Sequence, residues 1–297
     1  MTEPQQVISF SEHHRQRINH FLAHQLEQLA PQSSRLKEAV AYALLSGGKR
    51  IRPLLVYAVA DMIQADMQSA DHIAASIEMI HAYSLIHDDL PAMDDDDLRR
   101  GQPTCHIQFD EATAILAGDA LQAMAFELLS HTPAEPSTIV SLIQYLTRAC
   151  GMNGMAGGQS LDLEAEDKTL QLTELENIHA LKTGALLSAC VDITVLLKPG
   201  LTESTAQQLN LFGRNFGVAF QIVDDILDLT SDTQTLGKPA GSDTENNKST
   251  YPQLLGLDQA REKAREHIET SRTALHATGL DGQHLLDLCT KILNRNN

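Results

Sequence analysis

The 297-residue sequence contains no tryptophan, and its aromatic residues amount to only 4% of the total. Proteins that bind single-stranded nucleic acids stack the bases on aromatic side chains, so this composition disfavours that class. Basic residues are also few, with 22 Lys and Arg against 39 Asp and Glu and a formal net charge of −17. This balance argues against a nucleic acid or an anionic membrane surface as a partner.

Paired cysteines and long apolar runs are missing as well. The four cysteines are widely spaced without a CxxC pair, so the sequence predicts neither a zinc site nor a disulfide framework. The first residues are polar, and the apolar stretches 54–60 and 184–197 are too short or too interrupted to span a bilayer. We therefore expect a cytoplasmic protein with reduced thiols and no membrane span.

Apolar residues at helical spacing fill nearly every segment between turn signals, and alternating β-branched runs are scarce. This pattern predicts an all-α fold. No linker or repeat divides the chain, so residues 1–297 are expected to form a single domain. The predicted helices cover residues 9–29, 35–46, 53–66, 70–90, 109–131, 136–151, 173–197, 202–230, 251–278 and 281–294.

Turn and cap residues support these boundaries. Gly157-Gly158 predicts a break between helices, and Ser137 and Thr202 are predicted N-caps. The segments 70–90, 173–197 and 202–230 are apolar around most of their circumference. Such helices belong in the interior of a large bundle.

A first acidic cluster ends the apolar segment 70–90. Acidic runs are usually solvated surface, but two carboxylates about 4 Å apart repel by about 4 kcal/mol at an effective dielectric of 20, and this run continues an apolar helix. A cation is therefore expected there. Pro91 disrupts the helix, so the chain can bulge and bring Asp94 round towards Asp88. The cluster consists of Asp88, Asp89, Asp94, Asp95, Asp96 and Asp97.

A second acidic cluster, Asp224-Asp225-Ile226-Leu227-Asp228, lies within the predicted helix 202–230. At about 100° per residue, Asp224 and Asp228 fall on one face, about 6 Å apart along the axis. Ligand sets made only of oxygen suit Mg²⁺, which commonly joins one or two carboxylates to substrate phosphates. Two such clusters on apolar helices favour a metal site over a solvated surface.

Basic residues accompany both acidic clusters. The stretch Gly47–Pro53, GGKRIRP, is a basic turn that enters a helix, where backbone N–H groups, the helix dipole and guanidinium groups all favour phosphate. Arg99 and Arg100 directly follow the first cluster, and Lys238 follows the second. An acidic protein can therefore still bind an anionic ligand at these places.

Together these motifs resemble the short-chain trans-isoprenyl diphosphate synthases, or polyprenyl synthetases, and among them the bacterial farnesyl branch. The resemblance runs in order from about Leu44 to Leu257, and only Ile107 and Asn247 depart from the pattern, which has Lys and Gly at these places. It implies an isoprenoid synthase fold of about ten core helices around a deep cavity, in a homodimer. The motifs are SLIHDDLPAMDDDDLRRG, FQIVDDILD, GGKRIRP, LKTGAL, GKPAGSD and TYPQLLGL.

The resemblance also implies a set of ligands. Three Mg²⁺ ions, for which Mn²⁺ could substitute, are expected between the allylic diphosphate and Asp88, Asp94 and Asp224. The implied reaction condenses isopentenyl diphosphate with dimethylallyl and geranyl diphosphate to give (2E,6E)-farnesyl diphosphate. The remaining acids of the two clusters have no implied role beyond the charge of the site, namely Asp89, Asp95, Asp96, Asp97, Asp225 and Asp228.

Two diphosphate subsites follow from the same resemblance. A lone histidine on an apolar helix is more often a core residue, but His81 lies seven residues before Asp88 on nearly the same face, and the resemblance favours a binding role. Isopentenyl diphosphate is expected at Lys49, Arg52, His81 and Arg100. The allylic diphosphate is expected at Arg99, Lys182, Thr183, Gln221 and Lys238, and the first four of these are also the expected catalytic residues.

Product length is expected to depend on the residues beneath the first aspartates. Ser84 and Tyr83 lie four and five residues before Asp88, or roughly 6–7.5 Å down the helix. The Tyr83 ring can close the tail channel and limit the product to C15, whereas an ordinary core tyrosine would have no such effect.

Four other functions remain open. A geranylgeranyl diphosphate synthase shares the insert in the first motif, and Tyr83 favours C15 over it. A non-catalytic partner subunit is expected to lack one aspartate cluster, and both are present. A divalent-ion buffer would not need Lys49, Arg52, Arg99 and Lys238. A terpene cyclase would not need a second diphosphate site.

Overall fold

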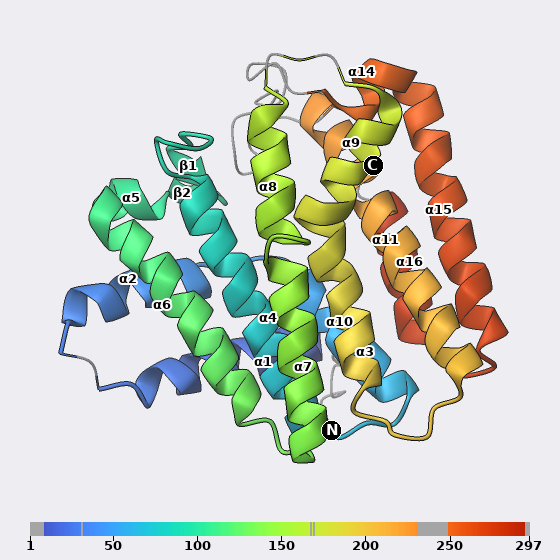
Figure 1. The fold of residues 1–297 in the computed structure, drawn as a ribbon, viewed down its shortest axis with the longest axis horizontal. Coiled ribbons are helices and arrows are strands. Elements are labelled where there is room, and N and C mark those ends of the chain that lie inside the picture. The colour runs from blue at the N-terminus through green and yellow to red at the C-terminus, as the bar shows by residue number, and fades with distance from the viewer. Residues whose placement is uncertain (1–8, 31, 167, 169, 231–248, 295–297) are drawn as a thin grey trace, which may run out of the picture.

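The computed structural model describes residues 9–30, 32–166, 168, 170–230 and 249–294. Helices dominate, and the only strands in this part of the chain form a two-stranded hairpin. The all-α prediction is therefore confirmed (Figure 1). The elements are α1 (Phe10–Glu27), α2 (Ser34–Leu45), α3 (Ile51–Met62), α4 (Met67–Asp88), β1 (Leu98–Arg99), β2 (Gln102–Pro103), α5 (Cys105–Gln108), α6 (Glu111–Ser130), α7 (Pro136–Cys150), α8 (Met155–Glu164), α9 (Leu172–His179), the π-helical turn η1 (Ala180–Gly184), α10 (Ala185–Val195), α11 (Glu203–Thr230), α14 (Tyr251–Leu255), α15 (Leu257–Ala277) and α16 (Gln283–Leu293).

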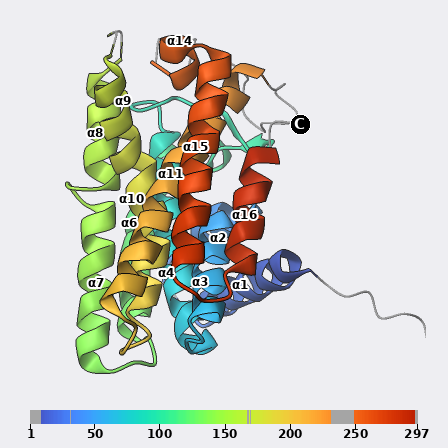
Figure 2. The same cartoon turned by 90° about the vertical axis from the view of Figure 1, so that its right-hand side faces the viewer.

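The core forms where the apolar helices α3, α4 and α10 lie against one another. Leu55 of α3, Ile77 of α4 and Cys190 of α10 are almost completely buried. Figure 1 shows α6 to the left of this centre and α15 and α16 to the right. In Figure 2, α15 and α16 lie on the face turned to the viewer, in front of α11. The first predicted metal-binding cluster follows α4, and the second lies near the end of α11, so both clusters lie towards the same end of the bundle.

Helix starts follow local capping chemistry. The Thr202 hydroxyl accepts a hydrogen bond from the Thr205 N–H at 3.1 Å, as expected of an N-cap. Ser137 is not an N-cap, because α7 begins one residue earlier, at Pro136, with Glu135 as its N-cap. Proline suits the first helical position, where its missing N–H would have no intrahelical partner.

One predicted break is wrong, because Gly157 and Gly158 lie inside helix α8. Glycine lowers helix propensity, but tertiary contact overrides propensity here. A Cβ added to Gly158 would come within 2.1 Å of the Lys182 backbone nitrogen. Gly158 therefore lets α8 approach η1 more closely than a larger residue would permit.

Two predicted helices are interrupted. The segment 173–197 consists of α9, η1 and α10, and a π-helical turn within an α-helix frequently marks a functional site. The segment 251–278 is divided at Gly256, whose φ of 83° ends α14 before α15 begins. The β1–β2 hairpin was not predicted, and its turn contains Arg100 at φ 56° and Gly101 at φ 75°.

Two helical stretches, Glu111–Ser130 and Leu172–Val195, are long and apolar enough to cross a membrane by length and composition alone. Within their most apolar windows, 39% and 50% of the residues are buried inside the bundle. Core helices of soluble proteins pass the same test, so the expected absence of a membrane span stays a prediction.

Candidate active site

The first aspartate cluster folds back on itself after α4. The helix ends at Asp88, and the Asp94 N–H then donates to the Asp88 carbonyl oxygen at 2.9 Å. The turn at Pro91 therefore brings Asp94 beside Asp88, as its position in the sequence predicts. Both residues are half-buried, whereas Asp95 and Asp97 are exposed.

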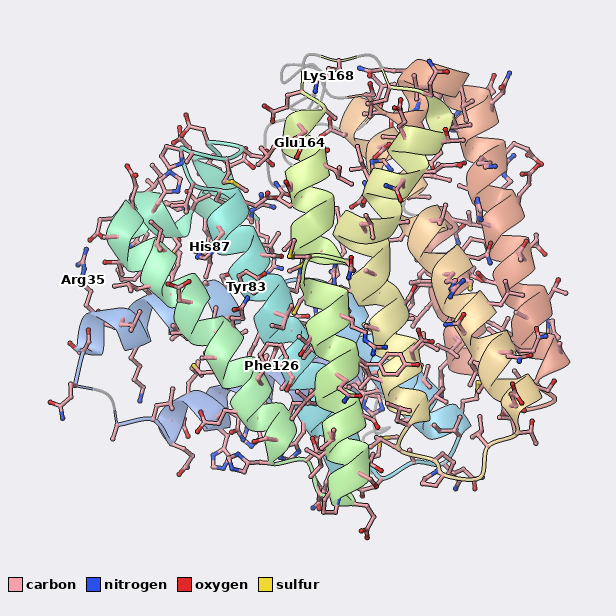
Figure 3. All side chains as sticks on the ribbon, in the orientation of Figure 1. Arg35, Tyr83, His87, Phe126, Glu164 and Lys168 are labelled. Carbon is pink, nitrogen blue, oxygen red and sulfur yellow. The ribbon has the colours of Figure 1, made fainter. Side chains whose placement is uncertain are left out.

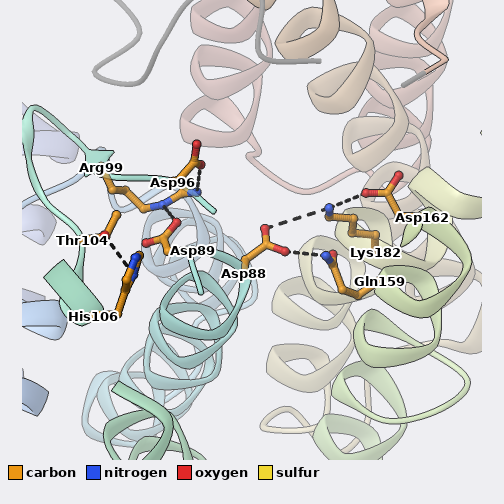
Figure 4. A network of polar contacts seen from close by, with 9 residues as sticks. All are labelled: Asp88, Asp89, Asp96, Arg99, Thr104, His106, Gln159, Asp162 and Lys182. Atoms are coloured by element: carbon orange, nitrogen blue, oxygen red, sulfur yellow. Dashed lines mark hydrogen bonds and ion pairs between the residues drawn. The ribbon is translucent and has the colours of Figure 1, made fainter. Parts of the chain in front are cut away.

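The Asp88 carboxylate faces two other elements across the site (Figure 4). Gln159 Nε2 of α8 donates to Asp88 Oδ1. Lys182 Nζ of η1 lies 4.0 Å from Asp88 Oδ2 and 2.7 Å from Asp162 Oδ2 of α8. Asp88 of the first cluster and Lys182, which is predicted to bind diphosphate, thus lie close together, and each contacts a residue of α8.

Sequence reasoning missed Gln159 and Asp162. Their spacing of three residues places them on one helical face, which is a usable signal. The predicted break at Gly157-Gly158 concealed that face, because it removed the helix on which the two residues lie.

Asp89 has a different environment from Asp88. Its side chain is buried and accepts from Arg99 Nε at 2.5 Å, while Arg99 Nη2 donates to Asp96 Oδ2 at 3.0 Å. Burial raises the pKa of Asp89 to about 7, and the nearby Arg99 opposes this rise. Asp89 and Asp96 therefore orient the Arg99 side chain.

The glycine-led basic turn joins the β1–β2 hairpin. Gly47 and Gly48 have φ values of 89° and 126°, and the Arg100 guanidinium donates to the Gly47 carbonyl. A Cβ on Gly48 would lie 2.8 Å from Arg100 Cζ. The guanidinium therefore lies directly against the turn.

Burial affects the charge of two side chains near this turn, those of Arg52 and His81. Arg52 Nε is buried without a hydrogen-bond partner. Burial lowers the pKa of Arg52, and Cys190, Glu78 and Asp224 act in the opposite direction. Burial, and then the charges of Arg52 and Arg100, hold the pKa of His81 well below 6.5, so the imidazole is neutral at neutral pH.

The structure therefore gathers three of the four residues expected at isopentenyl diphosphate, and an orphaned arginine donor suits a phosphate oxygen. Lys49 is exposed beside them on the turn. A pocket between α2, α4 and the hairpin includes His81, Arg99 and Arg100 in its wall.

The second aspartate cluster contains buried and accessible members. Asp224 is half-buried and lies within electrostatic reach of Arg52, whereas Asp225 and Asp228 are buried. Asp225 Oδ1 accepts from Gln221 Nε2, and Asp225 Oδ2 accepts from the Tyr251 N–H, both at 3.0 Å. Asp225 thus joins a predicted substrate-binding residue to the start of α14.

Helix α11 also lies close to the turn that carries Lys182 and the half-buried Thr183. A Cβ on Gly217 would be 3.2 Å from Gly184 Cα. Gln221 follows Gly217 by one helical turn, so it lies on the face of α11 that is turned towards η1. Lys238 and Asn247 lie outside the described residues.

The donor set fits Mg²⁺ as a partial coordination shell. Asp88, Asp94 and Asp224 offer only oxygen atoms, which magnesium prefers, and Mg²⁺ usually keeps waters and substrate phosphates among its ligands. Across the described part of the chain, no three His, Cys, Asp or Glu side chains could hold a metal by themselves. Waters and phosphate oxygens would therefore complete the site.

Tyr83 is half-buried on α4, and Figure 3 shows it below His87, the residue before Asp88. Its ring meets that of His87 edge-on, with 5.6 Å between centroids. Ser84 Oγ donates to the His81 carbonyl at 2.8 Å. The Tyr83 ring is therefore the bulkier group of the two expected to limit product length.

Comparison with known proteins gives concordant matches. A family model described as polyprenyl synthetase matches residues 33–278. A farnesyl diphosphate synthase of Haemophilus influenzae is 52% identical over 89% of this chain and 90% of its own, and that of Escherichia coli is 47% identical over the full length of both. A Helicobacter pylori geranyltransferase, solved with magnesium and isoprenyl diphosphate, has a TM-score of 0.86 at 35% identity over 99% of this chain and 98% of its own. The chain belongs to the polyprenyl synthetase family.

Proposed function

We propose that the protein is a farnesyl diphosphate synthase, which condenses isopentenyl diphosphate with dimethylallyl diphosphate and then with geranyl diphosphate. The observation that carries this proposal is the presence of two separate groups of residues at one end of the bundle, each suited to one diphosphate. Asp88 and Asp94, which would hold metal ions, form one group with Lys182, and Arg52, His81 and Arg100 form the other. Farnesyl diphosphate synthases at 45–52% identity, which cover most of this chain, support the same reaction.

In the proposed reaction the allylic diphosphate leaves first. Three Mg²⁺ ions are expected, and Asp88, Asp94 and Asp224 would hold them. These ions would supply positive charge that stabilises the leaving diphosphate. Arg99 and Lys182 bind the same group. The C–O bond breaks, and both of its electrons stay with the diphosphate.

The allylic cation is then attacked by the double bond of isopentenyl diphosphate. The Thr183 hydroxyl, the Lys182 carbonyl and the Gln221 amide oxygen stabilise the cation by their dipoles, and exclusion of water from the closed site would protect it. A new C–C bond forms, and the resulting tertiary cation loses a proton from the neighbouring carbon to the released diphosphate. Lys49, Arg52, His81 and Arg100 hold the second substrate in place.

A C15 product is proposed because Tyr83 lies below the first aspartates. The related alternative is a C20 product, since a chloroplastic geranylgeranyl pyrophosphate synthase of Arabidopsis thaliana is 47% identical over 77% of this chain and 65% of its own. The bulk of the Tyr83 ring favours the shorter chain.

The enzyme is also proposed to be a cytoplasmic homodimer. Helix α6 has a mean hydropathy of 1.3 in its most apolar window, and Ile115 and Leu116 on it are 44% and 54% exposed. A helix this apolar at the surface supports burial against a second copy.

The reaction is tested with purified protein, labelled isopentenyl diphosphate and either dimethylallyl or geranyl diphosphate, with Mg²⁺ or with EDTA. Chromatography of the dephosphorylated prenols should show a Mg²⁺-dependent C15 alcohol from both allylic substrates. Activity that persists in EDTA, or the absence of any condensation, would contradict the proposal.

A further inference from the structure

Glu78 is a buried carboxylate with no part in the function proposed above. It lies on α4 one turn before His81, and its side chain is only 3% exposed. Its Oε1 accepts from Arg50 Nη1 at 2.7 Å, and the Arg50 side chain is 2% exposed. A buried ion pair of this kind contributes little net stability, because desolvation offsets much of the attraction. Its presence beside the site therefore calls for another explanation.

The Arg50 guanidinium has two further hydrogen-bond partners. Nε donates to Asn19 Oδ1 of α1 at 2.9 Å, and Nη2 donates to the Leu44 carbonyl at the end of α2 at 2.8 Å. Together with Glu78, these partners tie Arg50 to three helices. Arg50 itself holds the left-handed φ of 51° that starts α3.

Arg50, held in this way, fixes the positions of the cationic side chains around it. Lys49 precedes it, Arg52 follows it by two positions, and the carbonyl of Gly47 in the same turn accepts from Arg100. Burial lowers the pKa values of Arg52 and Arg100, and the charge of Glu78 opposes this decrease in both. The Glu78 carboxylate thus acts on Arg50, Arg52 and Arg100. We call Lys49, Arg52 and Arg100 the cation group.

We propose that Glu78 is a positioning residue for the isopentenyl diphosphate site. Its carboxylate holds Arg50, and through Arg50 the Gly47–Arg50 turn, so that Lys49, Arg52 and Arg100 converge before the substrate binds. The inference rests on the proposed function, because it assumes that these cations bind isopentenyl diphosphate. Because the Glu78 carboxylate is bonded to Arg50, it would act on that substrate through these cations.

The test compares Glu78→Gln with Asp71→Asn. Asp71 lies two turns earlier on α4 and is also buried, and it accepts from Arg17 Nε at 2.7 Å and from the Tyr57 hydroxyl at 2.7 Å. Both substitutions remove a buried charge from the same helix, but only Glu78 adjoins the cation group. We expect Glu78→Gln to raise KM for isopentenyl diphosphate about 10- to 100-fold, with KM for geranyl diphosphate unchanged. Asp71→Asn should lower Tm and leave both KM values unchanged.

A second variant, Asn19→Ala, loosens Arg50 from the opposite side without altering Glu78. It should raise KM for isopentenyl diphosphate in the same direction but less, and it remains informative if Glu78→Gln does not fold. An unchanged or lower KM for isopentenyl diphosphate in both variants overturns the proposal. A lower KM would show that Glu78 only reduces the positive charge of the site, since its removal would then strengthen anion binding.

Arg52→Gln separates this inference from the function on which it rests. If Arg52→Gln leaves KM for isopentenyl diphosphate unchanged, the site assignment fails and the inference fails with it. If Arg52→Gln raises that KM while Glu78→Gln and Asn19→Ala do not, only the role of Glu78 is wrong.

Discussion

Asp224 and Asp225 are neighbours in the chain, and yet their side chains meet different surroundings. Asp224 is half-buried near Arg52, whereas Asp225 is 4% exposed and accepts from Gln221 and Tyr251. A carboxylate committed to two hydrogen bonds is less available to a metal. The two residues should therefore contribute differently to metal binding and to stability.

We expect Asp225→Asn to destabilise the protein by about 1–3 kcal/mol, because an amide cannot accept both hydrogen bonds without leaving a buried donor unpaired. Asp224→Asn should raise the Mg²⁺ concentration needed for half-maximal activity. Urea unfolding and Mg²⁺ titration of both variants measure the two effects. The same Mg²⁺ requirement in both variants would show that Asp225 is a ligand after all.

Tyr83→Ala should lengthen the product from C15 to C20, because removal of the ring opens space below Asp88. Chromatography of the dephosphorylated prenols measures the chain length. Tyr145→Ala is a suitable control, since Tyr145 is 41% exposed on α7. An unchanged product profile in Tyr83→Ala would refute its role as the floor of the channel.

Residue-level prediction from the sequence succeeds where the cause is local. Pro91 ends the regular helix, and that is enough to predict that Asp94 turns back towards Asp88. The contacts of Gln159 with Asp88 and of Asp162 with Lys182 span 71 and 20 residues along the chain. These two contacts depend on how α8 packs against the rest of the bundle. The sequence around each residue does not indicate that packing.

At the scale of elements, helix type and approximate length follow from apolar periodicity, while irregularities do not. The π-helical turn η1 interrupts an evenly apolar helix, and the β1–β2 hairpin is only two residues long on each side. Both features carry arginine or lysine residues of the site. Short or irregular elements are stabilised by tertiary contacts, so the sequence around them gives little indication.

Gly158→Ala tests the close approach of α8 and η1. The added Cβ would lie 2.1 Å from the Lys182 nitrogen, and we expect a loss of about 1–3 kcal/mol of stability with a lower kcat as Lys182 is displaced. Gly184→Ala is the control, because its Cβ would come no closer than 3.4 Å to another group. Thermal unfolding and steady-state kinetics give the comparison, and equal effects in both variants would contradict the packing argument.

At the scale of the whole molecule, the all-α class is predictable because nearly every segment has helical periodicity. Residues 1–297 remain a single predicted domain, and the proposed homodimer would bury the apolar surface of α6. Composition alone does not indicate which apolar helix stays exposed, since α6 and the core helix α10 are both strongly apolar.

Leu116→Asp should shift the protein from dimer to monomer, because it places a charge on the exposed apolar face of α6. Light scattering after size-exclusion chromatography measures the mass. Leu280→Asp is the matched control, since Leu280 is 41% exposed in the loop before α16. A monomeric wild type, or a dimer that persists in Leu116→Asp, would contradict an interface on α6.

The left-handed conformation of Arg50 has a consequence for the order of folding. A residue with a side chain in this region is disfavoured by roughly 1–2 kcal/mol, and here three hydrogen bonds from the guanidinium offset that cost. Those bonds need α1, α2 and α4 in their final places. The basic turn can therefore adopt its shape only in the fully packed chain, and a partly folded intermediate should have no organised site for isopentenyl diphosphate. Bound substrate would then stabilise only the native state.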